Sequence, residues 1–112
     1  MTRSVPAMRL SIFIGEHDTW HRRPLYHEIV ERARDAGLAG ATVLRGSEGF
    51  GTHARVHTTR LIDLAENLPL LILIVDAEDA IRAFLPSLQE LITEGSVILD
   101  RVELIRYGGE DQ

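Results

Sequence analysis

The chain of 112 residues contains no cysteine, and all twelve of its basic residues are arginine. The absence of cysteine excludes disulfides, thiolate metal sites and cysteine nucleophiles. The absence of lysine excludes a Walker-type phosphate lysine, a Schiff-base lysine and a lysine general base. Recognition of phosphate would therefore rest on arginine, whose guanidinium group can bind phosphate or carboxylate through two parallel hydrogen bonds.

Long apolar runs and a basic charge balance are also missing. The longest apolar run, Leu68–Val75, is far too short to span a bilayer, and residues 1–7 lack the apolar core of a signal peptide. A formal net charge of −5 argues against bulk binding of nucleic acid. We expect one cytoplasmic globular domain over residues 8–107, with frayed ends at 1–7 and 108–112.

Four segments have the pattern of strands, either alternating apolar and polar residues or forming a short apolar run. They are residues 8–15, 41–45, 70–75 and 101–107. The segment 58–68 fits either a helix or a returning strand.

Apolar residues at helical spacing predict two helices. The first begins at Pro24, because proline suits the first helical position, and ends at a Gly37 cap. The second begins with Asp76 as its N-cap and is closed by Gly95, with a kink at Pro86.

Two β-α-β units in this order predict an α+β, ferredoxin-like βαββαβ subunit with an antiparallel sheet. In that fold the helices cover only one face of the sheet. The run Leu70–Val75 has no polar alternation, so both faces of this strand need cover. We expect another subunit to cover the second face, because large exposed apolar patches are typical of interfaces.

The stretch after the second predicted strand carries the strongest functional signal. Three glycines within six residues let the backbone approach a ligand closely, and arginines and histidines surround them. Glycine-rich turns present N–H groups to anions, so the stretch predicts an anion or nucleotide site. The competing interpretation is a tight turn with solvated arginines. The candidate ligand-binding residues are Arg45, Gly46, Gly49, Phe50, Gly51, Arg55, His57 and Arg60.

Other polar clusters give weaker signals. His53 and His57 would share one face of a helix, but no carboxylate stands at a supporting spacing, so we predict no metal site. Glu16-His17-Asp18 and His21 either line a cleft or form a turn after the first strand, and we favour the turn. No catalytic constellation stands out, so we predict no enzyme activity.

Several motifs occur together along the chain. They are Trp20-His21, Pro24-Leu25-Tyr26, the segment 36–43, Arg45-Gly46, Gly49-Phe50-Gly51 and Asn67-Leu68-Pro69 before Ile72-Leu73-Ile74-Val75. With these motifs the chain from Met8 to Tyr107 resembles the PII signalling proteins, and more closely a bacterial PII-like family described as a domain of unknown function.

The resemblance implies a homotrimer whose clefts between subunits bind adenine nucleotides, without a further cofactor. It also implies a loop that reports ligand binding to a target protein, with a membrane transporter as one candidate. Arg106 occupies the region where PII proteins place a phosphate-contacting arginine. Residues 93–100 lack the glycines and lysines of the PII nucleotide site, so a nucleoside monophosphate or a cyclic nucleotide is an equal candidate to ATP.

Two alternatives remain open at this point. One is a metal-binding trimer similar to copper-tolerance-type relatives, in which His53 and His57 would matter most. The other is a weak enzyme that acts on a phosphorylated or carboxylated small molecule.

Overall fold

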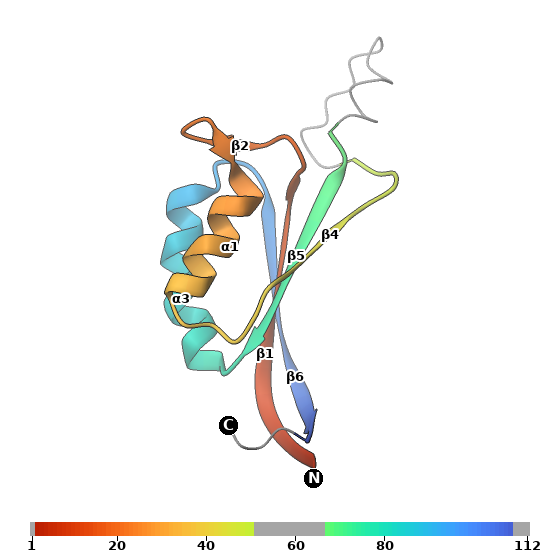
Figure 1. The fold of residues 1–112 in the computed structure, drawn as a ribbon, viewed down its shortest axis with the longest axis vertical. Helices are drawn as coiled ribbons and strands as arrows, with labels where there is room; N and C mark the ends of the chain where they lie inside the picture. The colour runs from red at the N-terminus through yellow and green to blue at the C-terminus, as the bar shows by residue number, and fades with distance from the viewer. Residues whose placement is uncertain (1, 51–66, 109–112) are drawn as a thin grey trace.

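The computed structural model describes residues 2–50 and 67–108, which form a four-stranded sheet, a small hairpin and two helices (Figure 1). The sheet contains β1 (Thr2–Gly15), β4 (Thr42–Arg45), β5 (Pro69–Asp76) and β6 (Ser96–Tyr107); the hairpin is β2 (Thr19–Trp20) with β3 (Arg23–Pro24); the helices are α1 (Leu25–Asp35) and α3 (Glu78–Leu91). The strand order is β4-β5-β1-β6, with every neighbouring pair antiparallel. This confirms the predicted ferredoxin-like α+β fold.

The core lies between the sheet and the two helices. Leu10 and Ile12 of β1 and Ile72 of β5 are fully buried against Ile29 of α1 and Ile81 of α3. Their positions follow from two periodicities, because alternate strand residues and every third or fourth helix residue point to one side. Each such side chain stabilises the fold by about 1.5–3 kcal/mol through removal of apolar surface from water.

The opposite face of the sheet carries no helix among the described residues, as Figure 1 shows. Along β5 burial alternates, so Leu71 and Leu73 are only partly buried on this side. Phe13, Leu44 and Ile98 are 37%, 48% and 52% exposed there. We call this surface the open sheet face. Its apolar character agrees with the expectation drawn from the run Leu70–Val75.

The ends of α1 match the sequence signals. The helix begins directly after Pro24, and Gly37 has a φ of 81°, the left-handed conformation that favours glycine. The Leu38 N–H donates to the Ala33 carbonyl at 3.1 Å, and the Gly37 N–H donates to the Arg34 carbonyl at 3.0 Å. These two bonds form a Schellman motif, which satisfies the last carbonyls of the helix.

The ends of α3 differ from the prediction. Asp76 does not cap the helix. Its Oδ2 accepts a hydrogen bond from the Ala39 N–H at 2.9 Å, which connects the segment before β4 to the end of β5. The helix continues through Pro86 and ends at Leu91, before Gly95. Gly95 instead lies against β1, where a Cβ would stand 2.8 Å from the Phe13 carbonyl oxygen.

The expectation that residues 1–7 are frayed was wrong for 2–7, which belong to β1. They pair with residues 102–107 of β6, and β6 begins at Ser96 rather than at position 101. The Arg9–Asp100 ion pair, at 2.7 Å, also joins the two strands. This β1–β6 ribbon extends past the helices toward both termini (Figure 1). The described residues do not include position 1 or residues 109–112. Of the ambiguous segment 58–68, they include only the last two residues.

Candidate functional site

Three segments meet at one end of the sheet. Gly15–Asp18 follows β1, Arg45–Phe50 ends β4 and continues beyond it, and Asn67–Pro69 leads into β5. The order β4-β5-β1 places them side by side, with β5 in the middle. We call this group the sheet-end site. It contains the described part of the glycine-rich stretch.

Gly46 and Gly49 both approach Pro69 closely. The Gly46 N–H donates to the Pro69 carbonyl oxygen at 2.8 Å. A Cβ on either glycine would stand 3.0 Å from Pro69 Cγ, and Gly49 has a φ of 155° that side chains rarely permit. The Gly46 amide is therefore engaged in the sheet. Both glycines shape the turn, as the competing interpretation predicts, and so fix where their neighbours lie.

Arg45 forms an ion pair with Glu16 across the end of β5. Arg45 Nη1 lies 2.8 Å from Glu16 Oε2, with the two side chains 59% and 23% exposed. The Glu16 N–H donates to the Leu68 carbonyl at 2.8 Å, which fixes the backbone from which the carboxylate projects. The guanidinium is thus presented at the surface of the sheet-end site, with Glu16 as its acidic neighbour.

The residues after β1 form a turn, as we favoured. The Gly15 N–H donates to Asp18 Oδ2 at 2.8 Å, and the His17 N–H donates to Asn67 Oδ1 at 2.9 Å. A Cβ on Gly15 would stand 2.8 Å from the same Asn67 oxygen, so a larger residue here would have to push the Asn67 side chain away. Sequence reasoning missed the part played by Asn67, although its place directly before an apolar run was a signal.

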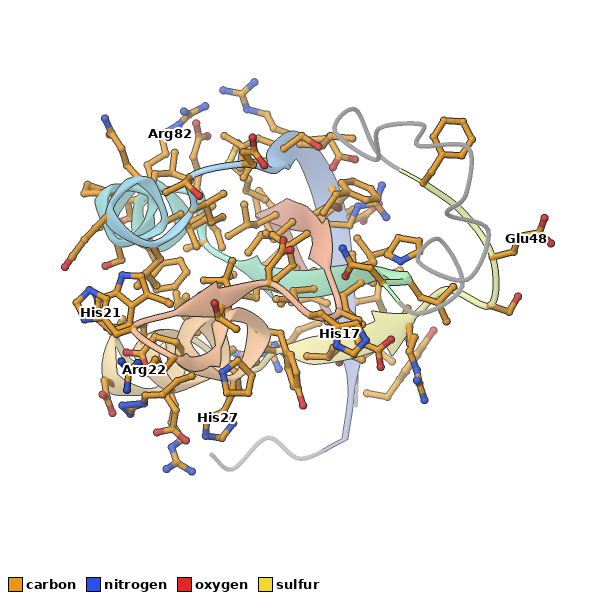
Figure 2. The ribbon with its side chains drawn as sticks, turned by 90° about the horizontal axis from the view of Figure 1, so that it is seen from above. His17, His21, Arg22, His27, Glu48 and Arg82 are labelled. Carbon is orange, nitrogen blue, oxygen red and sulfur yellow. The ribbon has the colours of Figure 1, made fainter. Side chains whose placement is uncertain are left out.

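Figure 2, which looks down on this end of the sheet, shows His17 near the strand ends and Glu48 at the periphery. Phe50 is 79% exposed and does not anchor the loop on the core, so its ring is accessible. The other candidates of the glycine-rich stretch lie outside the described residues; they are Gly51, Arg55, His57 and Arg60.

Arg106 is not beside Arg45 within one chain. Arg106 of β6 pairs with Arg3 of β1. The sheet-end site lies next to another pair of the same two strands, Phe13 with Ser96. Ten strand residues separate the two places, a distance of roughly 33 Å at about 3.3 Å per residue. Arg106 can join the sheet-end site only from another copy of the chain.

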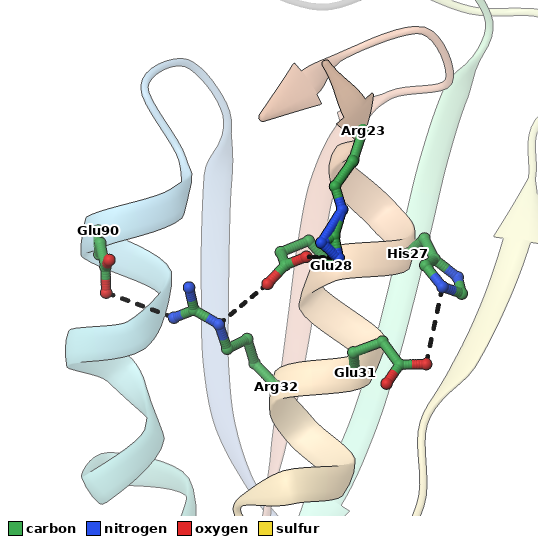
Figure 3. A network of polar contacts seen from close by, with 6 residues as sticks. All are labelled: Arg23, His27, Glu28, Glu31, Arg32 and Glu90. Carbon is green, nitrogen blue, oxygen red and sulfur yellow. Dashed lines mark hydrogen bonds and ion pairs between the residues drawn. The ribbon is translucent and has the colours of Figure 1, made fainter. Parts of the chain in front are cut away.

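A second polar cluster joins the two helices (Figure 3). Arg32 lies 3.1 Å from Glu28 and 3.3 Å from Glu90, and Glu28 is buried. Desolvation lowers the pKa of Arg32, but its hydrogen bonds to Glu90 and Glu28 outweigh that effect and raise it. The guanidinium also lies 5.2 Å from the centre of the Trp20 ring. Because each of these groups has a partner within the cluster, we assign the cluster to helix packing.

The hairpin next to this cluster is strained. His21 and Arg22 have φ values of 51° and 69°, which cost energy for residues with a side chain. The His21 ring stacks on Trp20 with 4.0 Å between centroids, which helps to hold the turn. Figure 2 shows His21 and Arg22 of this hairpin on the helix side, away from Glu48.

An apolar groove of about 410 Å³ lies between α3 and β6. Its lining contains no charged side chain, so it does not suit an anion; the residues are Leu85, Leu88, Gln89, Ile92, Gly95, Ser96, Val97 and Leu99. Within residues 2–50 and 67–108 no group of three or more His, Asp or Glu is placed to hold a metal ion. None of the helices in these ranges is long and apolar enough to cross a membrane.

Comparison with protein families gives a match over nearly the whole described fold. The model of the family DUF190, described as "Uncharacterized ACR", matches residues 7–104. The chain belongs to the DUF190 family. This agrees with the resemblance to a PII-like family of unknown function that the motifs indicated.

Two curated relatives support this membership. A UPF0166 protein of Aquifex aeolicus is 34% identical over 103 residues, which covers 92% of this chain and 97% of the relative. A UPF0166 protein of Methanocaldococcus jannaschii is 33% identical over 95 residues, with 85% and 87% of the two chains covered.

Two solved structures of PII-like proteins are similar to the structure of this DUF190 member. CPII of Thiomonas intermedia K12, a nitrogen regulatory PII-like protein bound to ADP, AMP and bicarbonate, has a TM-score of 0.60 at 15% identity, covering 91% of this chain and 98% of CPII. A putative PII-like signaling protein of Thermus thermophilus has a TM-score of 0.58 at 19% identity, covering 92% and 91%. The DUF190 chain therefore has a PII-like fold.

Proposed function

We propose that this DUF190 protein is a PII-like regulatory protein that binds a small anionic ligand, an adenine nucleotide, and controls a target protein. It has no catalytic activity of its own in this proposal. The observation that carries it is Arg45, which stands exposed beside a tight glycine turn at the end of a PII-like sheet.

The residues of the sheet-end site suit the two parts of a nucleotide. Arg45 supplies a guanidinium group that can hold a phosphate through charge-assisted hydrogen bonds. Phe50, with its exposed ring, supplies a face on which a base can stack. Gly51, Arg55, His57 and Arg60 enter the proposal on their sequence positions alone.

The PII-like neighbours support the choice of ligand. CPII is described with ADP, AMP and bicarbonate, and also with ADP, AMP and acetate. These ligands are nucleotides and small carboxylates, the anions that an arginine recognises. Because identity to these structures is below 20%, they support the ligand class and no individual contact.

We propose a homotrimer assembled through the open sheet face. Its half-exposed apolar side chains, Phe13, Leu44 and Ile98, support an interface there. Such an assembly would also let Arg106 of one subunit approach the sheet-end site of another. The target protein, for which a membrane transporter is our candidate, rests on the resemblance to PII proteins.

Calorimetric titration with ADP, AMP and a series of divalent metals tests the proposal. Arg45→Ala should weaken ADP binding about tenfold or more, because a hydrogen bond to a charged group is worth about 1.5–3 kcal/mol. Arg34→Ala is the matched control, since Arg34 is an exposed arginine on α1 whose ion pair within the described part of the chain is with Glu31 at 3.7 Å. It should leave ADP binding unchanged.

Two results would contradict the proposal. One is that no nucleotide binds at millimolar concentration while a divalent metal does, which would favour the metal-binding alternative. The other is that the two arginine variants weaken ADP binding equally, which would mean that Arg45 acts only through the net charge.

A further inference from the structure

The sheet-end site has a carboxylate of its own, and the proposed ligand is an anion. Glu16 Oε2 lies 2.8 Å from Arg45 Nη1, so the guanidinium that would receive a phosphate already has a partner. The contact uses Nη1 only, so an incoming anion either binds the other donors of Arg45 beside Glu16 or displaces Glu16. Building on the proposed function, we propose that Glu16 is a specificity-determining residue that lets the site accept nucleotides and reject inorganic polyanions.

Glu16 cannot move far away once it is displaced. Its backbone N–H is bonded to the Leu68 carbonyl at 2.8 Å, and it follows Gly15, whose N–H is bonded to Asp18 Oδ2. The next residue, His17, is held through its N–H by the Asn67 side chain at 2.9 Å. The backbone on both sides is therefore fixed, so a displaced carboxylate stays within the length of one side chain from its place beside Arg45.

A carboxylate that remains beside a bound phosphate discriminates by hydrogen bonding. An ionised carboxylate can only accept hydrogen bonds, so it repels a ligand that offers only acceptor oxygens. Pyrophosphate is close to such a ligand, because its only donor near neutral pH is the one acidic proton that it retains. ADP carries the same two linked phosphates, but its ribose hydroxyls, next to the α-phosphate, are donors that Glu16 can accept from.

The test compares ADP with inorganic pyrophosphate in calorimetric titrations of the wild type and of Glu16→Gln. The amide keeps the size of the side chain and gains a donor, so repulsion of pyrophosphate is removed. Pyrophosphate binding should strengthen about fivefold, the upper value for an exposed ion pair, whereas ADP binding should change less than about twofold. Circular dichroism melting of each variant checks that it is folded.

Three further variants distinguish a specific effect of Glu16 from a general effect of charge. Glu48→Gln removes a carboxylate from the segment after β4, which Figure 2 shows at the periphery, and it should change both affinities by the same small factor. Glu16→Asp keeps the charge and should keep the rejection of pyrophosphate. In an Arg45→Gln background the Glu16→Gln effect on pyrophosphate should become smaller, because Arg45 no longer holds the ligand beside Glu16.

The outcomes separate the two proposals. If the wild type binds ADP and Glu16→Gln changes ADP and pyrophosphate equally, the role of Glu16 is overturned and the proposed function stands. If neither protein binds ADP, the proposed function and the role of Glu16 are both overturned. Unequal changes that also occur in Glu48→Gln would show a general charge effect and overturn the role of Glu16.

Discussion

The open sheet face gives the clearest quantitative prediction. Leu71 of β5 lies between Phe13 of β1 and Leu44 of β4 in the strand register, so it stands at the centre of the exposed apolar cluster. We predict that Leu71→Gln weakens self-association strongly and leaves the single subunit folded. The helix-facing core does not involve this side chain.

The magnitude follows from the burial of Leu71 in the subunit. Full burial of a leucine side chain is worth about 1.5–3 kcal/mol, and since Leu71 is already partly buried we assign about 1–2 kcal/mol to assembly. A trimer contains three copies, so the loss is about 3–6 kcal/mol, or roughly 10²–10⁴ in the association constant. Sedimentation velocity over a range of concentrations measures this shift.

Ile72→Ala is the matched control on the next residue. Ile72 is fully buried on the helix side, so its truncation should cost about 2–5 kcal/mol of folding stability. It should lower the melting temperature while the folded fraction still assembles. The reasoning is refuted if the wild type sediments as a monomer at micromolar concentration, or if Leu71→Gln assembles as the wild type does.

Two other predictions concern the turn and the acid response. Gly46→Ala, which places a Cβ 3.0 Å from Pro69 Cγ, should destabilise the fold by about 1 kcal/mol and weaken ADP binding. Gly40→Ala, with open space around its Cβ, should do neither; equal melting temperatures for the two variants would contradict this. The hydrogen bond from Arg82 lowers the pKa of Glu78 from its ordinary value of about 4.5, so ionised Glu78 stabilises the fold above that pH. That stability is lost as the pH falls through the lowered pKa, and Glu78→Gln should flatten the acid side of a melting-temperature profile; an unchanged profile would count against it.

Much of the fold could be predicted because its signals are local. Alternation in β1, the cap at Gly37 and the helical stripe of α3 each lie within one segment. The extension of β1 to Thr2 could not be predicted in this way, because its partners, residues 102–107, are about a hundred positions away. Long-range pairing with β6 decides the structure of residues 2–7, and their own pattern does not.

The site was predictable only in part, because some of its contacts depend on long-range strand pairing. The glycine-rich stretch was visible, but the Glu16–Arg45 contact depends on the strand order, which brings the ends of β1 and β4 to either side of β5. Arg106 was grouped with the other candidates by resemblance. Since β6 is antiparallel to β1, its carboxyl end lies at the opposite end of the sheet, so the fold alone separates Arg106 from Arg45.

A native mass spectrum of the purified protein, recorded before and after addition of ADP, tests the central claim most directly. The account predicts an assembly of three chains, three times the 12.5 kDa subunit mass, that carries up to one nucleotide per subunit and loses it in Arg45→Ala. A single chain whose mass does not change when ADP is added would contradict the account.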